Sequence, residues 1–182
     1  MGRTKQLLDW PTRDGKKPLV AAAYDAIRPI CDEMVVVLGH EADAVAAALQ
    51  GRSFHPAHAN ADAPMFDSIR AGLLSAQSID CDAAIVLQPG DHPEVAASTL
   101  TALTDWSLQR PVQAVIPEYE GRGGHPVFIP ASVVQRILEA DCPTGLGDFW
   151  AAHPDLAIRL AVGDRSILRD VDTPGDLGRS SR

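Results

Sequence analysis

An aspartate follows a strongly apolar run at residues 83–91, in the stretch AAIVLQPGD. The run predicts a strand buried on both faces, with Gly90 and Asp91 in the turn at its carboxyl end. One carboxylate oxygen at this position could bind Mg²⁺ while water and substrate phosphates supply the remaining ligands. His92 is expected to line the turn, because magnesium prefers oxygen ligands. An ordinary turn before a helix is the alternative interpretation.

Two further carboxylates occur in the stretch RDVDTPGDL. Asp170 and Asp172 alternate on an extended segment, so both side chains point the same way and either could share a cation with Asp91. A short helix is predicted to begin at Thr173, and acidic residues favour helix N-termini for purely structural reasons. The sequence leaves both explanations open.

Two glycine-containing stretches could bring backbone close to a ligand. In MGRTK, Gly2 permits close approach, and Lys5, with Arg3 beside it, could place positive charge on a phosphate. A solvated, charged segment is the alternative there. In GRGGHPVFIP, Gly124 and His125 belong to a glycine cluster that is typical of a backbone approached closely by another group. A simple hairpin loop would give the same pattern.

Composition narrows the class of protein. The chain has 182 residues and a net charge of −8, which argues against a nucleic-acid or anionic-membrane partner. No stretch resembles a signal peptide or a membrane span, so we expect a cytoplasmic protein. Cys31, Cys81 and Cys142 are too few and too scattered for a zinc site or a disulfide framework, and we interpret them as inert thiols. His55 and His58 are interpreted as surface histidines.

Strand-like and helix-like patterns alternate along the whole chain. Strands are predicted within residues 33–40, 83–91, 112–119, 121–130 and 156–164, the last as a half-exposed edge strand. Helices are predicted within residues 17–30, 41–51, 64–77, 94–108, 132–140 and 173–177. In the helix at 64–77, Met65, Ile69, Leu73 and Leu74 are expected to share the buried face. This order predicts an α/β fold, a three-layer sandwich with a mostly parallel central sheet, in a single domain over residues 1–182.

Taken in order, these stretches resemble the MobA-like nucleotidyltransferases, and among them the cytidylyltransferases of molybdenum cofactor biosynthesis. The resemblance rests on MGRTKQLL, NADAPMFDSIRAGL, VLQPGDHP, GGHPVF and DVDTPGDL. It implies a nucleotide-diphospho-sugar-transferase-like sheet and a nucleotide site formed by Gly2, Arg3, Lys5, Asn60 and Ser68. It further implies Mg²⁺ held by Asp91 and Asp172, catalysis by Lys5 and Asp91, and an acceptor bound near Gly124 and His125.

The implied reaction joins CTP, or next GTP, to molybdopterin-bound molybdenum, with a molybdenum enzyme or its chaperone as a partner. A sugar phosphate or another small phosphorylated acceptor is an alternative. A protein that binds a nucleotide or a pterin without turnover is another.

Two departures from the family pattern are visible. The family's first strand and glycine-rich turn have no counterpart ahead of the segment that begins at Met1, and Pro64 stands where the family usually has glycine. We therefore expect an N-terminally truncated chain whose first strand lies upstream. Without that central strand, two inner strand edges would lack partners, and each unsatisfied buried backbone group costs about 1–3 kcal/mol.

Overall fold

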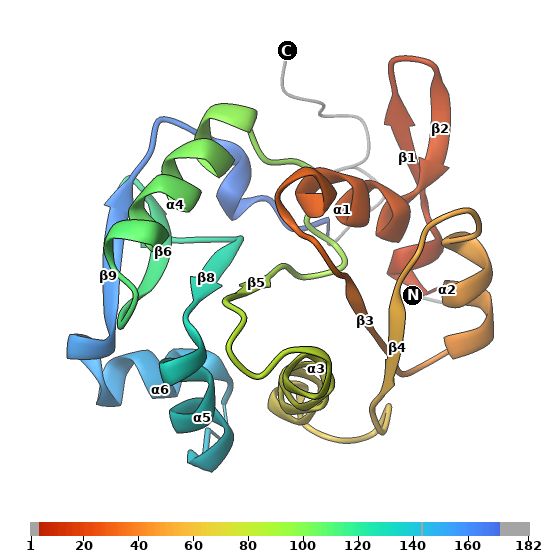
Figure 1. Ribbon diagram of the computed structural model, residues 1–182. Helices are drawn as coiled ribbons and strands as arrows, with labels where there is room; N and C mark the ends of the chain where they lie inside the picture. Colours follow the sequence, from red (N-terminus) through yellow and green to blue (C-terminus); the bar gives the residue numbers. More distant parts are fainter. Residues whose placement is uncertain (1–3, 143, 172–182) are drawn as a thin grey trace.

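The computed structural model of the protein describes residues 4–142 and 144–171 (Figure 1). The strands are β1 (Asp9–Thr12), β2 (Gly15–Pro18), β3 (Val35–Leu38), β4 (His55–His58), β5 (Ile85–Leu87), β6 (Ala114–Tyr119), β7 (Arg122–Gly123), β8 (Val127–Ile129) and β9 (Ala157–Ala161). The α-helices are α1 (Leu19–Ile27), α2 (Ala42–Ala48), α3 (Met65–Ile79), α4 (Ala97–Gln109), α5 (Ala131–Glu139) and α6 (Leu146–Ala152). Short 3-10 helices are η1 (Lys5–Leu7), η2 (Arg28–Ile30), η3 (Pro154–Leu156) and η4 (Arg165–Leu168).

The larger sheet has the strand order β5-β8-β6, with β7 and β9 also paired to β6. Strand β8 runs antiparallel to both β5 and β6, whereas β9 runs parallel to β6, so the sheet is mixed. The predicted edge strand at 156–164 is confirmed as β9, which pairs with β6 and leaves alternate residues exposed.

Alternate residues of these strands face two different helical layers, as the two-residue period of a strand requires. Val115 and Phe128 pack with Leu103 of α4 on one face. Ile116 and Ile129 pack on the other face, in a cluster that includes Phe149 and residues of α3, α5 and α6. The α/β three-layer architecture expected from the sequence is therefore confirmed, with helices on both faces of the sheet (Figure 1).

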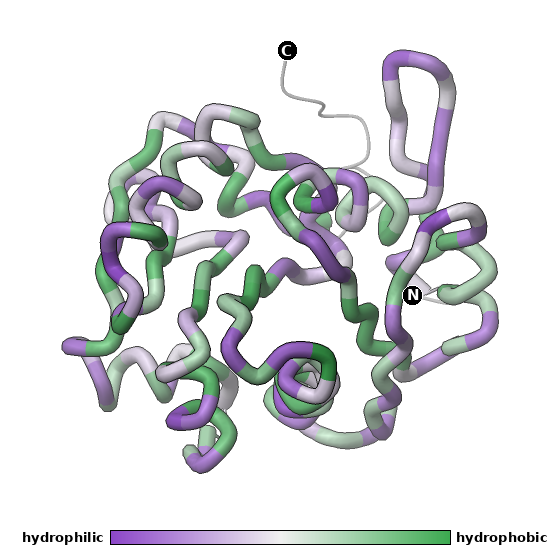
Figure 2. Tube along the Cα trace, in the orientation of Figure 1, coloured by the Kyte–Doolittle hydropathy of each residue, from purple (hydrophilic) through white to green (hydrophobic). Residues whose placement is uncertain are grey.

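Strands β3 and β4 form a separate parallel pair. Val35, Val36 and Val37 of β3 and all of β5 are only half-buried, although both segments are wholly apolar (Figure 2). The expectation that the β5 segment is buried on both faces is wrong, because within the described residues β5 has a hydrogen-bonded neighbour on one side alone, as does β3. Helix α3 packs against both the β3–β4 pair and the larger sheet. It contacts β3, and it shares a core cluster with Ile85 and Leu87 of β5.

Three elements are not predicted by the sequence patterns. Residues 9–18 form the antiparallel hairpin β1–β2, which projects from the body of the molecule (Figure 1). Residues 55–58 form β4, in which His55 and His58 are exposed as expected. Residues 146–152 form α6. The hairpin and β4 lack an apolar alternation, so only their pairing with a neighbouring strand reveals them.

The buried face of α3 agrees with the predicted one at Ile69 and Leu73 and differs from it at Met65 and Leu74. Met65 and Leu74 are exposed by 67% and 56%, whereas Phe66 and Leu73 are buried in the main core. At the start of the helix the Phe66 ring enters the core in place of the smaller Met65 side chain, which removes more apolar surface from water. The predicted helix at 173–177 lies outside the described residues.

The structure bears on two expectations from the sequence, one about membrane spans and one about the cysteines. Among the described residues, no helix combines the length and apolarity needed to cross a membrane. Cys31, Cys81 and Cys142 carry free thiols. Burial raises the pKa of the Cys31 thiol to about 11, so this thiol stays protonated at neutral pH.

Candidate functional site

The turn after β5 carries Asp91, the residue expected to bind a cation. The amide of Gln88 donates from Nε2 to the carbonyl oxygen of His92 at 2.7 Å, and His92 N donates to the carbonyl oxygen of Pro89 at 3.2 Å. These bonds close residues 88–92 into a compact turn. The Asp91 carboxylate is half-buried and makes no hydrogen bond or ion pair with another described residue.

The turn that precedes β8 brings Gly124 and His125 to the same place. The His125 ring meets the His92 ring edge-on, with centroids 5.3 Å apart, and His125 Nδ1 lies 3.4 Å from the Leu87 carbonyl oxygen. A Cβ added to Gly124 would lie 2.3 Å from the carbonyl oxygen of Ile167. Only glycine fits at that position without a backbone shift, which accounts for one of the glycines in the cluster.

The imidazole of His125 is held neutral. Burial lowers its pKa to about 4, and the neighbouring His92 acts in the same direction, while the Leu87 carbonyl and Asp91 oppose them. The Leu87 carbonyl oxygen can accept a hydrogen bond only from a protonated Nδ1, which leaves Nε2 as an acceptor. His125 can therefore orient a ligand by hydrogen bonding at neutral pH but supplies no positive charge.

A third turn, residues 167–171, joins the other two through backbone hydrogen bonds. His125 N donates to Ile167 O at 2.9 Å, and Val171 N donates to Asp91 O at 3.2 Å. Residues 88–93, 124–126 and 167–171 thus form one unit, which we call the three-turn cluster. The sequence places these turns up to 80 positions apart, as from Asp91 to Val171, and the fold brings them together.

The N-terminal segment approaches the cluster from the side of η1. A methyl group built on Gly90 would lie 3.8 Å from Cγ of Gln6, so η1, which contains Lys5, borders the Asp91 turn. Thr4 Oγ1 donates to the Glu41 carboxylate, which anchors the start of η1 to α2. Among the predicted site residues, Gly2, Arg3 and Asp172 lie outside the described residues.

Asn60 and Ser68 lie on neighbouring elements. Asn60 follows β4 and accepts a hydrogen bond from Asp62 N on its Oδ1 at 3.0 Å, and Ser68 lies in the first turn of α3. Among the hydrogen bonds of the described residues, none links either side chain to the three-turn cluster. Their nucleotide-binding roles stay predictions.

The sequence patterns did not reveal three residues whose side chains meet at the edge of the cluster, namely Arg169, Glu94 and Trp10. Arg169 Nη1 donates to Glu94 Oε2 at 2.9 Å, and Arg169 Cζ lies 5.1 Å from the centroid of the buried Trp10 ring. Glu94 comes three positions after Asp91, and Arg169 comes directly before Asp170. Two residues of opposite charge, Glu94 beside one carboxylate segment and Arg169 beside the other, are the signal that could have revealed this pair.

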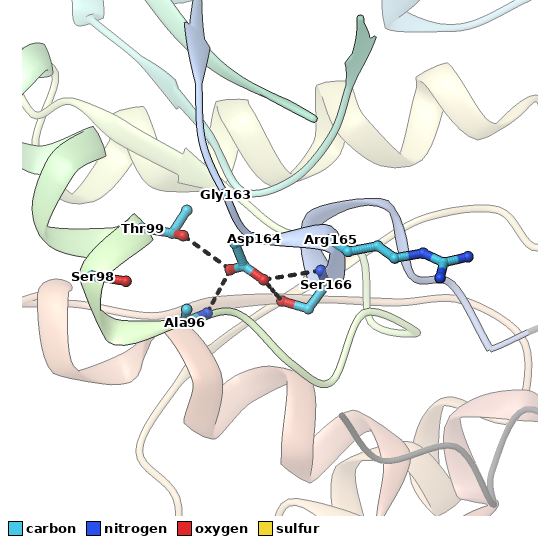
Figure 3. Close-up of a pocket in the computed structure, with 7 residues that line it drawn as sticks. All are labelled: Ala96, Ser98, Thr99, Gly163, Asp164, Arg165 and Ser166. Atoms are coloured by element: carbon cyan, nitrogen blue, oxygen red, sulfur yellow. Dashed lines mark hydrogen bonds between the residues drawn. The ribbon is translucent and has the colours of Figure 1, made fainter. Parts of the chain in front are cut away.

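A cavity of about 410 Å³ lies beside the cluster and is lined by none of the predicted site residues (Figure 3). Asp164 dominates it: this carboxylate accepts hydrogen bonds from Ala96 N at 2.7 Å, Thr99 Oγ1 at 2.9 Å, and the backbone and side chain of Ser166. Burial raises the pKa of Asp164, but these hydrogen bonds outweigh burial and lower it overall. Asp164 serves as the acidic group at the N-terminus of α4 and joins η4 to that helix.

A group of three side chains with metal-ligand chemistry lies elsewhere. Asp80, Cys81 and Asp82 follow α3, and their ligand atoms fall within 4.8 Å of one another, but all three are exposed. Acidic residues at an exposed turn commonly occur without an ion. In the part of the chain that the structure describes, the three-turn cluster therefore offers a cation the half-buried Asp91 carboxylate, and the exposed Asp170 lies on a neighbouring turn.

Comparisons with known proteins identify the family and the fold of the chain. Residues 1–156 match the family described as MobA-like NTP transferase domain, so the chain belongs to that family. Among curated proteins, no match was found. The structure is similar to Rv0371c from Mycobacterium tuberculosis, with 27% identity, a TM-score of 0.73, and coverage of 97% of this chain and 88% of that one. A second structure of Rv0371c, a complex with manganese, aligns at 24% identity with a TM-score of 0.68, covering 96% and 90%.

Two more distant structures share the fold. A nucleotidyl transferase from Methanothermobacter has 20% identity and a TM-score of 0.75, covering 94% of this chain and 81% of that one. A 4-diphosphocytidyl-2C-methyl-D-erythritol synthase from Anaerococcus prevotii has 14% identity and a TM-score of 0.67, covering 88% and 85%. Both likenesses concern the fold. The α/β nucleotidyltransferase architecture expected from the sequence is confirmed.

Proposed function

We propose that this protein transfers a nucleoside monophosphate from a nucleoside triphosphate to a phosphate oxygen of a small acceptor. The observation that carries the proposal is the three-turn cluster, in which an unengaged carboxylate and a neutral imidazole meet beside the segment that contains Lys5. Family membership supports a nucleoside triphosphate as one substrate. An attack of this kind depends mainly on positioning and on neutralising charge, which such a cluster can provide.

The residues present fit a divalent cation. Asp91 offers hard oxygen ligands and makes no competing hydrogen bond within the described residues, and Mg²⁺ usually binds through one or two carboxylates together with substrate phosphates. Rv0371c has been solved with manganese, which supports a divalent cation in this fold. In our proposal Asp91 and Asp172 hold Mg²⁺. When bound, the ion neutralises the phosphate oxygens of the nucleotide and of the acceptor.

Side chains of the protein itself supply the remaining roles. Lys5, assisted by Arg3, neutralises the departing pyrophosphate, and Gly2 lets the backbone approach the phosphates. His125 orients the acceptor as a neutral hydrogen-bonding group, next to the close backbone of Gly124. A phosphate acceptor is already ionised near neutral pH, so the mechanism requires no general base. We place the remaining nucleotide contacts at Asn60 and Ser68.

CTP is the favoured nucleotide and GTP the next, with molybdopterin-bound molybdenum as the acceptor and a molybdenum enzyme or its chaperone as the recipient of the product. The motif order of the sequence supports this choice. Two alternatives stand beside it. A sugar phosphate or another small phosphorylated compound is a different acceptor for the same site, and non-catalytic binding of a nucleotide or pterin is a different function.

A turnover assay decides among these possibilities. The protein is incubated with each of the four NTPs, with Mg²⁺ or Mn²⁺, and with molybdopterin-bound molybdenum or a panel of phosphorylated acceptors, while pyrophosphate release is followed. We expect release that depends on CTP, cation and molybdenum cofactor together. Nucleotide binding without pyrophosphate release under every combination would contradict the enzymatic proposal and favour the binding protein.

The variant Asp91→Asn ties the activity to the cluster. It preserves size but removes the charge that a cation needs, so we expect loss of cation-dependent turnover with an unchanged melting temperature. Asp105→Asn, an exposed aspartate of α4, is the matched control and should retain full activity. Near-wild-type turnover by Asp91→Asn would remove the cation from this site.

A further inference from the structure

Two segments far apart in the sequence, residues 91–99 and 164–171, are joined along their lengths. At one end Asp164 accepts hydrogen bonds from Ala96 N and Thr99 Oγ1, and at the other Val171 N donates to Asp91 O. Between them lies the Arg169–Glu94 ion pair, with 2.9 Å between Nη1 and Oε2. The contacts run in opposite chain directions, so the two segments lie antiparallel. The segment leading toward Asp172 is thereby held against the segment that carries Asp91.

The Arg169–Glu94 pair is the contact in this series that is both charged and largely enclosed. The side chains of Arg169 and Glu94 are 16% and 24% exposed, and the guanidinium lies over the ring of Trp10, which is itself 3% exposed. Trp10 packs in turn against Val171, the residue whose backbone binds Asp91 O. The planar guanidinium can stack and donate at the same time, which an ammonium group cannot do.

We propose that Arg169 is a positioning residue for the cation site. It would fix the spacing between the Asp91 turn and the segment that enters Asp172, by pairing with Glu94 and stacking on Trp10. The proposal rests on the proposed function in one respect, namely that Asp91 binds a divalent cation. Groups that orient cation-binding side chains from outside typically change metal affinity by about 10–100-fold when they are removed.

A direct measurement of cation binding tests this role. Mn²⁺ is titrated into the full protein, and the unbound ion is followed by electron paramagnetic resonance, alongside the Mn²⁺ dependence of nucleotide turnover. We expect Arg169→Gln to raise the Kd for Mn²⁺ by about tenfold or more. Arg169→Lys keeps the charge but loses the planar stack, so its affinity should fall between those of Arg169→Gln and the wild type.

Two further variants give the controls. Arg159 on β9 pairs with Glu118 at 3.3 Å on the surface, an ion pair that includes no residue of the three-turn cluster, so Arg159→Gln should leave Mn²⁺ affinity unchanged. Glu94→Gln should weaken Mn²⁺ binding as Arg169→Gln does. The loss in the double variant should be smaller than the sum of the two single losses, because two partners of one contact are not additive.

The outcomes separate the positioning role from a merely structural one. If Arg169→Lys and Glu94→Gln bind Mn²⁺ as the wild type does while their melting temperatures fall, the pair only stabilises the fold and the inference is overturned. Arg169→Lys and Glu94→Gln decide the question even if Arg169→Gln does not fold. If the wild type binds Mn²⁺ through Asp91 but turns over no nucleotide, the proposed function fails while the positioning role stands or falls on the titration alone.

Discussion

The three-turn cluster and the N-terminal region hold their proposed ligand-binding groups in different ways. Around the cluster, β6 and β8 are almost wholly buried, and backbone hydrogen bonds connect three turns from distant parts of the chain. In the N-terminal region, Lys5 lies in a single 3-10 turn, next to the two-stranded β1–β2 and β3–β4 pairs with half-buried strands. In the proposed site, tight packing therefore positions the groups for the cation and the acceptor, Asp91 and His125. The positive charge comes from Lys5, which lies in a short 3-10 helix.

Lys5 gives the largest expected effect, and the effect is on rate alone. A charge that stabilises a transition state is worth about 2.7–4 kcal/mol on the scale of oxyanion donors, so Lys5→Ala should lower kcat/KM by about two to three orders of magnitude. Its free energy of unfolding should change by far less, about 1 kcal/mol, because Lys5 is only half-buried. Steady-state kinetics and urea unfolding measure the two quantities. Lys5→Arg should not restore the full rate, because a planar guanidinium replaces a compact ammonium group. Full activity of Lys5→Ala would show that Lys5 has no role in catalysis.

Gly124→Ala tests the packing of the cluster. The new Cβ would lie 2.3 Å from Ile167 O, a backbone atom that cannot move aside as a flexible side chain would. We expect the free energy of unfolding to fall by about 3 kcal/mol, at the upper end of overpacking effects, and activity to fall with it. Gly147→Ala in α6 meets no atom within 4 Å and is the control, expected to be neutral or slightly stabilising. A stable Gly124→Ala protein would show that the turns are not tightly joined.

His125 makes the stability of the cluster depend on pH. Its folded-state pKa is about 4, below the 6.5 of an unperturbed histidine, so between these values the unfolded chain binds more protons. Stability therefore falls as pH decreases from 6.5 toward 4, by roughly 2–3 kcal/mol from this group. Urea unfolding at stepped pH should show this slope, and His125→Gln should flatten it. An equal slope in the variant would assign the pH dependence to other groups.

Shortening a side chain should lower the unfolding free energy more in β8, beside the cluster, than in β3, in the N-terminal region. Ile129→Ala removes a fully buried side chain of β8, and we expect a loss of about 2–5 kcal/mol in unfolding free energy. Val36→Ala removes a half-buried side chain of β3 and should cost only about 1 kcal/mol. Urea unfolding of both variants measures the difference. Equal losses would mean that β3 is as tightly packed as β8.

The smallest effect is expected for Asp25, which joins elements of the N-terminal region. Its carboxylate accepts from Arg52 at 2.8 and 2.7 Å and from Lys17 at 2.7 Å, and the Arg52 hydrogen bond outweighs burial in lowering the pKa of Asp25. The contribution is present above pH 3.8 and is lost as pH falls below it. Because Asp25 is 35% exposed, Asp25→Asn should cost only about 1 kcal/mol after solvent screening.

Lys16 offers the control for that measurement. It lies 4.0 Å from Asp9, and both side chains are 70% exposed. Lys16→Ala should therefore leave the melting temperature nearly unchanged. A larger loss from Lys16→Ala than from Asp25→Asn would contradict the view that Asp25 holds β2, α1 and the segment after α2 together.

The sequence by itself determined the order of the elements and the turns that carry chemistry. Local periodicity located α1, α4, α5 and the edge strand β9, because a side-chain repeat reports how each residue faces its own neighbours. The same patterns placed Asp91 at the end of β5 and Gly124 and His125 before β8. They could not reveal β4, whose pairing with β3 involves residues about 20 positions away, nor the half-burial of β3 and β5, which depends on which strand edges are paired.

Tertiary structure alone decided how the chemical groups meet. The bond from Val171 N to Asp91 O, the approach of Gly124 to Ile167 O, and the Arg169–Glu94 pair connect segments separated by tens of residues. No local repeat encodes such contacts, since they form only after the sheet and its covering helices have brought distant loops together. Their geometry also sets the neutral state of His125, because burial and neighbouring charges exist only in the folded chain.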